Sequence, residues 1–259
     1  MKVSAVIIAF NEEAKIADAI RSVIWADEIL VVDSESNDRT RAIAEALGAR
    51  VIEKKWAGFA DQKQFAVDNA AYDRVMSLDA DERVSDSLKA EIADICRMDV
   101  VADGYKIPRL STYMGREIRH SGWYPDRQLR FFDRRKAHWK RVAVHESIVM
   151  ADGATTDNLR SPILHYSIDN PRHHAEMIQS RYAPLAADAM LAAGRRTSRL
   201  TIVFLPAITF LQTYFLKAGF LDGFAGICIA YFSAYNVFLK HLMLYEQQQS
   251  AGSKLHRAP

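Results

Sequence analysis

The sequence is poor in several features that define common protein classes. It has only two cysteines in 259 residues, Cys96 and Cys228, and their spacing matches no metal site. Two isolated thiols give no support to a disulfide framework or a cysteine-ligated zinc site, and they suit a protein of the reducing cytoplasm. The formal net charge is only +2, so the composition argues against a dedicated nucleic-acid binder.

Two nucleotide-binding motifs and a clear export signal are also missing. Neither G-x-G-x-x-G nor G-x-x-x-x-G-K-[ST] follows any apolar run, which removes most of the support for a dinucleotide-binding or P-loop fold. The opening stretch MKVSAVIIAF is apolar, but NEE follows it directly and no small-residue cleavage site is present. We therefore expect a first strand here and a chain that is not exported.

The first hundred residues alternate short apolar runs with amphipathic segments. Strands are predicted at residues 3–10, 28–34, 50–56 and 74–78, and helices at 11–25, 37–48, 61–71 and 85–97. This order predicts an α/β fold with a Rossmann-like, mostly parallel sheet flanked by helices and joined by right-handed crossovers. We expect a binding or catalytic domain over residues 1–170 and a helical region over residues 171–259.

Polar signals follow three of the predicted strands, as NEE, DSESND and DADE. The carboxyl ends of parallel strands lie along one edge of a sheet, and ligands bind such sheets at that edge. We therefore expect these three segments to converge in space and to form the binding site.

The DADE segment offers two carboxylates on one face. In extended chain Asp79 and Asp81 point to the same side, and Glu82 points to the other. Two hard oxygen donors suit Mg²⁺ or Mn²⁺ that bridges a diphosphate. The alternative is that Asp81 and Glu82 only begin the next helix, where negative charge is favourable.

The order and spacing of these motifs also resemble a known family. Three motifs resemble the glycosyltransferase family 2 group with the GT-A fold, namely AFNEE, VVDSESNDRT and SLDADE. Four later segments are similar to its bacterial sub-group typified by lipopolysaccharide core β-1,4-glucosyltransferases, namely WAGFADQKQFA, HSGWYPDRQLRFF, AVHES and ILHYS. The resemblance implies an inverting transferase that uses a nucleotide sugar, commonly a UDP-sugar, and a divalent metal, Mg²⁺ or Mn²⁺.

The resemblance also implies roles for residues at the first two strand ends. Asp33 would contact the uracil or the ribose of the donor, and Asn11 and Glu12 would line the same end of the pocket. The commonest family pattern has two adjacent acids after the second strand, whereas the second position here is Ser34. A contact with the base through that position therefore stays open.

The D-x-D pair of the family corresponds to Asp79 and Asp81, of which Asp81 would be the more direct metal ligand and Asp79 would also border the donor. His165 in ILHYS matches a late histidine that completes the metal shell, although a lone histidine is equally consistent with a hydrogen-bonded structural role. Gln62 and Lys63 match a segment near the donor. Lys63 is either a counter-charge for the diphosphate or a solvated helix lysine.

Inverting transfer needs one base that takes the proton from the attacking acceptor hydroxyl. Glu146 in VHES occupies the position of the family's catalytic acid residue, and a surface or salt-bridged glutamate is the alternative. His145 beside it would face the other way in a strand and so support the site. Trp123 and Tyr124 would stack on a sugar face of the acceptor, with ordinary packing as the alternative. Arg127 and Arg130 are predicted to anchor a phosphate or the acceptor through their forked donors.

The stretch from Leu200 to Leu244 is far more apolar than a soluble surface helix. It is interrupted by Pro206, Gln212, Lys217, Asp222 and Asn236, so a spanning helix is not the first interpretation. The basic GRRTSR segment before it suits attachment to an anionic cytoplasmic leaflet. Packing on the catalytic domain as ordinary core and a homo-oligomer interface are the alternatives.

These observations predict a metal-dependent glycosyltransferase at the inner face of the cell membrane. It would move a sugar, with glucose from a UDP-sugar as the first choice, onto a lipopolysaccharide core or related glycan or glycolipid acceptor. Two alternatives stay open: a polyprenyl-phosphate sugar synthase, and a non-catalytic nucleotide-sugar-binding module of the same fold.

Overall fold

The computed structural model describes residues 1–98, 100–140 and 147–255. The chain forms two compact units, composed of Met1–Leu110 with Pro125–Ser167 and of Ser111–Tyr124 with Ile168–Pro259. The short segment Ser111–Tyr124 therefore groups with the C-terminal helices, which the predicted division at residue 170 does not include. Each unit is described separately below.

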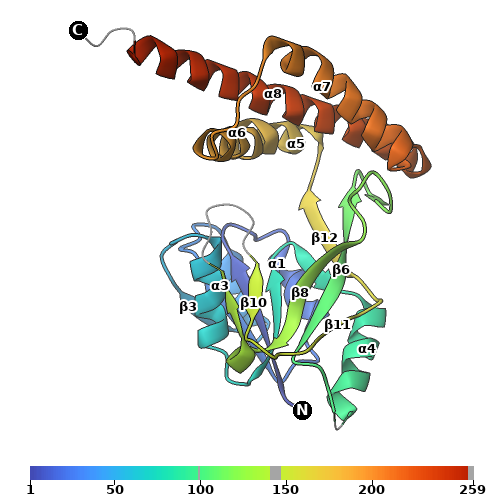
Figure 1. The fold of residues 1–259 in the computed structure, drawn as a ribbon. Helices are drawn as coiled ribbons and strands as arrows, with labels where there is room; N and C mark the ends of the chain where they lie inside the picture. The colour runs from blue at the N-terminus through green and yellow to red at the C-terminus, as the bar shows by residue number, and fades with distance from the viewer. Residues whose placement is uncertain (99, 141–146, 256–259) are drawn as a thin grey trace. The chain divides into compact units, whose positions relative to one another are not determined.

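The first unit is built on a sheet in which four neighbouring strands at one side are parallel (Figure 1). Strand β1 (Val3–Ala9) pairs in parallel with β2 (Glu28–Asp33) and with β4 (Arg74–Asp79), and β2 pairs in parallel with β3 (Arg50–Glu53). Among the described residues the strand order is β3-β2-β1-β4-β8-β6-β12-β5. The predicted α/β fold with a largely parallel sheet is confirmed.

The later strands of this sheet add antiparallel neighbours. Strand β8 (Asp126–Asp133) runs antiparallel to β4 and to β6 (Gly104–Tyr113), and β5 (Glu82–Val84) runs antiparallel to β12 (Ile163–Ile168). The peripheral strands are β11 (Thr156–Asn158) and β7 (Arg116–Glu117), which pair with β6, and β9 (Ala137–Trp139) and β10 (Ile148–Met150), which pair with each other. Because β8 lies against β4, residues of the DRQLRFF segment run beside the strand that ends in Asp79.

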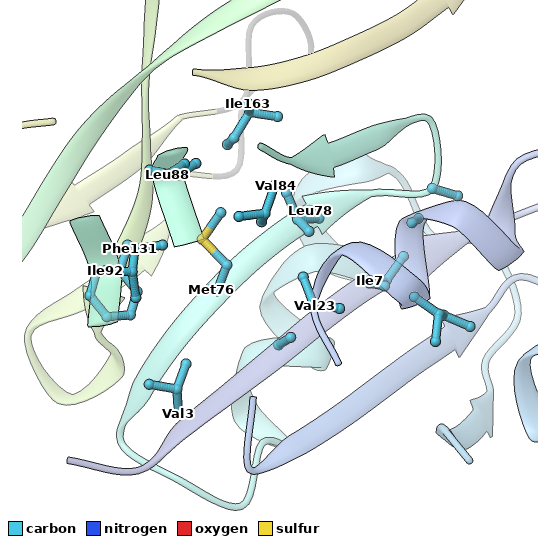
Figure 2. Close-up of a cluster of buried hydrophobic side chains, with 14 of the residues drawn as sticks. Val3, Ile7, Val23, Met76, Leu78, Val84, Leu88, Ile92, Phe131 and Ile163 are labelled. Atoms are coloured by element: carbon cyan, nitrogen blue, oxygen red, sulfur yellow. The ribbon is translucent and has the colours of Figure 1, made fainter. Parts of the chain in front are cut away.

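Both faces of the central sheet are covered, which explains why its strands read as unbroken apolar runs. The first unit has four α-helices in its described part, namely α1 (Ile16–Ser22), α2 (Thr40–Ala46), α3 (Phe59–Asp68) and α4 (Asp86–Arg97), and the short 3₁₀-helix η1 (Arg134–Lys136). On one face Ile7, Met76 and Ile92 pack in a cluster with other buried apolar side chains (Figure 2). On the opposite face Val6 and Val32 belong to a second cluster, since neighbouring strand residues point to opposite sides.

The second unit is helical apart from the hairpin formed by the end of β6 and β7. Its helical elements are α5 (Pro171–Met177), the π-helical turn η2 (Ile178–Tyr182), α6 (Ala183–Ala192), α7 (Arg199–Leu211), the π-helical turn η3 (Gln212–Leu216), the 3₁₀-helix η4 (Gly219–Asp222) and α8 (Gly223–Leu255). Helices α7 and α8 lie side by side (Figure 1) and are joined at one end by a hydrogen bond between Thr197 and His241. Tyr113, Ile118 and Ile229 form the centre of a small apolar core in this unit.

Two stretches of this unit are long and apolar enough to cross a membrane by length and composition. They are Arg199–Leu216 and Gly219–Ser250, and only 11% and 22% of their most apolar windows are buried. The predicted C-terminal apolar helices are therefore present, and they expose large apolar side chains such as Phe204, Phe224 and Tyr231.

Candidate active site

The ends of β1, β2 and β4 lie next to one another, as the order of polar segments predicts. In the sheet register Ala9 is opposite Asp33, and Ile8 is opposite Asp79. The sheet therefore brings the carboxylate that ends β2 and the carboxylate that ends β4 to the two sides of β1.

Hydrogen bonds fix the loops after β1 and β2 to each other. The backbone N–H of Asn11 donates to the Ser36 hydroxyl at 2.9 Å, and the Asn11 side-chain oxygen accepts from the backbone N–H of Asn37 at 2.9 Å. The backbone N–H of Glu12 donates to the Thr40 hydroxyl at 2.8 Å. Asn11 has a φ of 53°, in the left-handed region that asparagine tolerates better than most residues. Polar pairs between the two loops thus replace the helix that the sequence predicts from residue 11.

Asp33 is fully buried at the end of β2. Its Oδ2 accepts from the backbone N–H of Ser36 at 2.8 Å, and its Oδ1 accepts from the Ser36 hydroxyl at 2.6 Å. Each carboxylate oxygen can accept two hydrogen bonds, so both oxygens retain capacity for a further donor such as a ribose hydroxyl.

Gln62 of α3 is fully buried and connects this helix to the ends of β2 and β3. Its side-chain amide donates to the Ser34 hydroxyl and to the Lys54 backbone oxygen, both at 2.8 Å, and its oxygen accepts from Lys54 Nζ at 2.7 Å. Ser34, which stands where the family commonly has an acid, is thus engaged by Gln62. The role of Gln62 seen here is to hold elements together.

Asp79 is held between two cations that come from different elements. Lys63 Nζ of α3 lies 2.9 Å from its Oδ1, and Arg130 Nη2 of β8 lies 3.1 Å from its Oδ2. Burial by itself would raise the pKa of Asp79, but the charges and hydrogen bonds of Lys63 and Arg130 outweigh burial and hold this pKa well below its usual range. Lys63 is only 3% exposed, so it is not the solvated helix lysine considered above.

Glu82, which the sequence offered only as part of the start of a helix, instead begins β5, is fully buried and holds the turn after β4 in place. It accepts from the backbone N–H of Asp79 at 3.0 Å and from Arg130 Nη2 at 2.9 Å, and Arg109 Nη1 lies 3.4 Å away. The sequence signal for this role was the crowding of three carboxylates within four positions, because such a cluster requires neighbouring cations. The third carboxylate therefore binds Arg130, one of the two cations that compensate the first.

Asp81 lies beside His165, as the predicted metal shell requires. Asp81 Oδ2 is 3.4 Å from His165 Nε2, and the backbone N–H of Tyr166 donates to the Asp81 carbonyl at 2.9 Å. Burial favours the protonated form of Asp81, but the hydrogen bond and charge of His165 lower its pKa below the usual value. A carboxylate oxygen and an imidazole nitrogen are both ligands of Mn²⁺ and related divalent ions. Among the described residues no three His, Cys, Asp or Glu side chains gather as a ready cation site.

Arg130 has donors that no described residue uses. Its Nε and Nη1 atoms are buried without a hydrogen-bond acceptor among the described residues, and its guanidinium lies 5.9 Å from the Trp139 ring. Burial opposes the charge of this guanidinium, but Glu82 and Asp79 together raise its pKa. The D-x-D region thus contains a buried, permanently charged group with free N–H donors.

The other predicted acceptor residues are distributed over both units. Arg127 donates to the Leu159 carbonyl at 2.8 Å in the first unit. In the second unit Trp123 packs edge-on against Tyr113, and Tyr124 lies 5.9 Å from the Arg119 guanidinium. The predicted base Glu146 and its neighbour His145 lie outside the described residues.

Comparison with known proteins gives a family and several relatives. The model of the family "Glycosyl transferase family 2" matches residues 4–151. The chain is 28% identical to the lipopolysaccharide core biosynthesis glycosyltransferase LpsC of Rhizobium meliloti, over 94% of both chains. It is 31% identical to an uncharacterized glycosyltransferase of Rickettsia typhi, over 95% of this chain and 87% of the relative.

Two solved structures are also similar to this chain. Glucosyl-3-phosphoglycerate synthase from Mycobacterium tuberculosis, in complex with Mn²⁺, UDP and glucosyl-3-phosphoglycerate, is 26% identical over 44% of each chain, with a TM-score of 0.35. TarS residues 1–349 from S. aureus is 14% identical over 97% of this chain and 92% of that chain, with a TM-score of 0.47.

Proposed function

This chain belongs to glycosyl transferase family 2, has the GT-A fold and is related to lipopolysaccharide core biosynthesis, and from that premise we propose its reaction. It transfers a sugar, with glucose from a UDP-sugar as the first choice, to a hydroxyl of a lipopolysaccharide core or related glycan, with inversion at the anomeric carbon. The observation that carries this proposal is the D-x-D turn, where Asp79 is compensated by Lys63 and Arg130 while Asp81 lies beside His165.

The donor nucleoside would bind at the ends of β1 and β2. Asp33 would accept from the uracil or the ribose through the capacity that Ser36 leaves on its oxygens. Asn11 and Glu12 would shape the same end of the pocket, because both belong to the loop that is fixed to residues 36–40. Gln62 would hold the end of β2 in position through its hydrogen bond to Ser34.

Asp81 and His165 would hold a divalent metal, Mg²⁺ or Mn²⁺, with Asp79 at the border of the metal and the donor. When bound, this ion would supply positive charge for the diphosphate that leaves the sugar. Lys63 and Arg130 lower the pKa of Asp79 and hold its carboxylate by two ion pairs, which would orient it before the donor arrives. The free N–H groups of Arg130 would add donors for anionic oxygen.

Glu146 would act as the base of the transfer. As the acceptor oxygen bonds to the anomeric carbon, the bond from that carbon to the diphosphate breaks, and Glu146 takes the hydroxyl proton. Trp123, Tyr124 and Arg127 stay proposed acceptor contacts. Arg130, also predicted to bind the acceptor, has ion pairs with Asp79 and Glu82 that support a second role at the donor diphosphate.

We also propose that the enzyme acts in the cytoplasm on the inner face of the cell membrane. The support is the exposed apolar surface of α7 and α8, with Arg195, Arg196 and Arg199 at the start of α7. An enzyme bound to the membrane surface would encounter a glycolipid acceptor by diffusion in the plane of the membrane.

The test is release of nucleoside diphosphate from a panel of UDP- and GDP-sugars, with Mn²⁺ or with a chelator, in the presence of lipid A–core fragments or polyprenyl phosphate. We expect UDP release that needs both metal and a core acceptor. Asp81→Ala should abolish metal-dependent donor binding, and Glu146→Gln should keep donor binding but lose about 10²-fold or more in turnover. Transfer to polyprenyl phosphate alone would identify the rival synthase, and donor binding without transfer to any acceptor would indicate a binding module.

A further inference from the structure

The turn between η3 and α8 is fixed to the β6–β7 hairpin by one buried carboxylate. Asp222 is 2% exposed and accepts from the backbone N–H groups of Arg119 and His120, at 3.2 and 3.1 Å. The Ser121 hydroxyl donates to the same carboxylate at 3.1 Å, and His120 Nδ1 lies 3.0 Å from it. The interruption that Asp222 makes in the apolar sequence is therefore a structural contact within the second unit.

This contact determines on which side of a membrane the turn can lie. Residues Ser111–Tyr124 follow Leu110 of β6 and precede Pro125 directly, so the hairpin cannot be separated from the catalytic strands by a bilayer about 30 Å thick. Asp222 is bound to this hairpin, so the turn stays on the catalytic side. The Thr197–His241 hydrogen bond joins the start of α7 to α8, so we expect the α7–α8 pair not to cross the membrane.

The turn presents cations beside exposed apolar side chains. We define the tip cluster as the exposed Arg116, Arg119 and Lys217 together with the exposed apolar residues Phe215, Leu216, Phe220, Leu221 and Phe224. Arg116 donates to the Leu221 carbonyl at 3.1 Å, and Lys217 lies across Gly122 so closely that a Cβ there would be 2.7 Å from its Cδ. Gly122 (φ +77°) therefore provides the space in which the lysine is held.

Among the described residues, one exposed acid balances part of the positive charge of the tip cluster, and no ion pair is seen for Arg116 or Lys217. Glu117 pairs with Arg119 at 2.8 Å, and Asp222 is buried under the hairpin. The sequence has no charged residue from Leu200 to Leu216 or from Gly223 to Leu239. A second copy placed on this face would therefore bring cations against apolar surface, whereas an anionic lipid headgroup provides both a phosphate and acyl chains.

We propose that the tip cluster is a docking site for the phosphate headgroups of anionic phospholipids, with Lys217, Arg116 and Arg119 on the phosphates and the aromatic and leucine side chains at the acyl boundary. This inference rests on the proposed membrane attachment and names the lipid chemistry and the part of the fold that recognises it. The helix pair then lies along the bilayer surface with cations at both of its ends.

The test is binding of the full-length protein to vesicles of phosphatidylcholine, with and without phosphatidylglycerol, measured by co-sedimentation at low and high salt. We expect Lys217→Gln to lower the partition coefficient for the phosphatidylglycerol vesicles about fivefold, and to lose this effect in high salt. Phe224→Ser should weaken binding to both vesicles at either salt concentration. Lys89→Gln, at an exposed position of α4, is the matched control and should bind as the wild type does.

Metal-dependent UDP release is measured in the same samples, so that failure of the lipid-docking proposal can be distinguished from failure of the transferase proposal. Wild-type binding that ignores phosphatidylglycerol, or Lys217→Gln binding equal to wild type, would overturn the headgroup site and leave the transferase proposal intact. Wild type that binds neither vesicle would overturn membrane attachment as well, and a concentration-dependent dimer without vesicles would identify a second copy as the occupant. Thermal unfolding of each variant shows whether the comparison is between folded proteins.

Discussion

The residues of the D-x-D turn form a compensated charge network. Lys63 and Arg130 share Asp79, and Arg130 also shares Glu82 with Arg109. Removing one member of a buried ion pair leaves an uncompensated charge, which costs more than the pair contributes. Separating these groups would leave a buried charge without a partner, so we expect the network to stabilise the conformation of the turn.

Glu82→Gln tests this network. Glutamine has the same size but no charge, so Arg130 and Arg109 lose their shared counter-charge, and we expect the free energy of unfolding to fall by about 3 kcal/mol or more. Urea denaturation measures the change, with Glu45→Gln on exposed α2 as the matched control. A Glu82→Gln protein as stable as the control would show that Asp79 and Asp126 alone compensate the arginines.

His174 provides a pH test in the second unit. Burial, with a smaller effect of His173, lowers its pKa to about 4 from the ordinary value of 6.5. Between these two values the unfolded chain binds a proton that the folded chain does not. This group's contribution to the free energy of unfolding is thus complete above 6.5 and falls as the pH drops toward about 4.

His174→Phe should make stability less dependent on pH over this range, because phenylalanine keeps the ring contact with Phe232 and cannot titrate. Denaturation of the wild type and the variant at about pH 7 and about pH 5 measures the difference. An equal loss of stability in both proteins would assign the pH dependence to other groups.

At the scale of elements, the type of each helix or strand was easier to predict than its limits. The predicted helix from residue 11 to 25 is only Ile16–Ser22, because the loop before it bonds to residues 36–40 instead of continuing the helix. The predicted strand at 50–56 ends at Glu53. By contrast Ser85 caps α4 as predicted, since its hydroxyl accepts from the backbone N–H of Leu88 at 3.2 Å.

Ser85→Ala tests the importance of that cap. The Ser85 hydroxyl also donates to the Pro162 carbonyl at 2.7 Å, so the change removes the cap and a link to the segment before β12. We expect a loss of at least about 1 kcal/mol in the free energy of unfolding. Thermal or urea unfolding measures it, and Ser85→Thr, which retains both bonds, should stay near wild type. Equal stability of the alanine and threonine variants would contradict the cap.

At the scale of the whole molecule, polar chemistry and apolar surface are divided between two parts of the sequence. The first unit contains the carboxylates and their cations, whereas α7 and α8 expose large apolar side chains over most of their length. Exposed apolar area of this kind indicates an interaction surface, and here the basic residues before α7 favour an anionic membrane.

Arg195→Gln with Arg196→Gln tests the membrane surface at the other end of the helix pair from the tip cluster. Each charge contributes about 1 kcal/mol near an anionic surface, so the double variant should bind phosphatidylglycerol vesicles roughly thirtyfold more weakly at low salt. In cell fractionation the wild type should resist a high-salt wash and leave the membrane in detergent. Arg97→Gln, at an exposed position of α4, is the control. Wild-type protein that stays soluble and monomeric would contradict the surface proposal.

The sequence by itself determined the α/β alternation, the convergence of three polar strand ends and the contrast between the two halves of the chain. These are local properties, since apolar periodicity and strand order follow from neighbouring residues. Only the tertiary structure decided which partners the charged residues have. Glu82 turned out to hold Arg130 and Asp79, Lys63 is buried, and Asp222 binds a hairpin about a hundred residues earlier in the chain. Such pairs depend on segments that meet through the fold, and no spacing in the sequence encodes them.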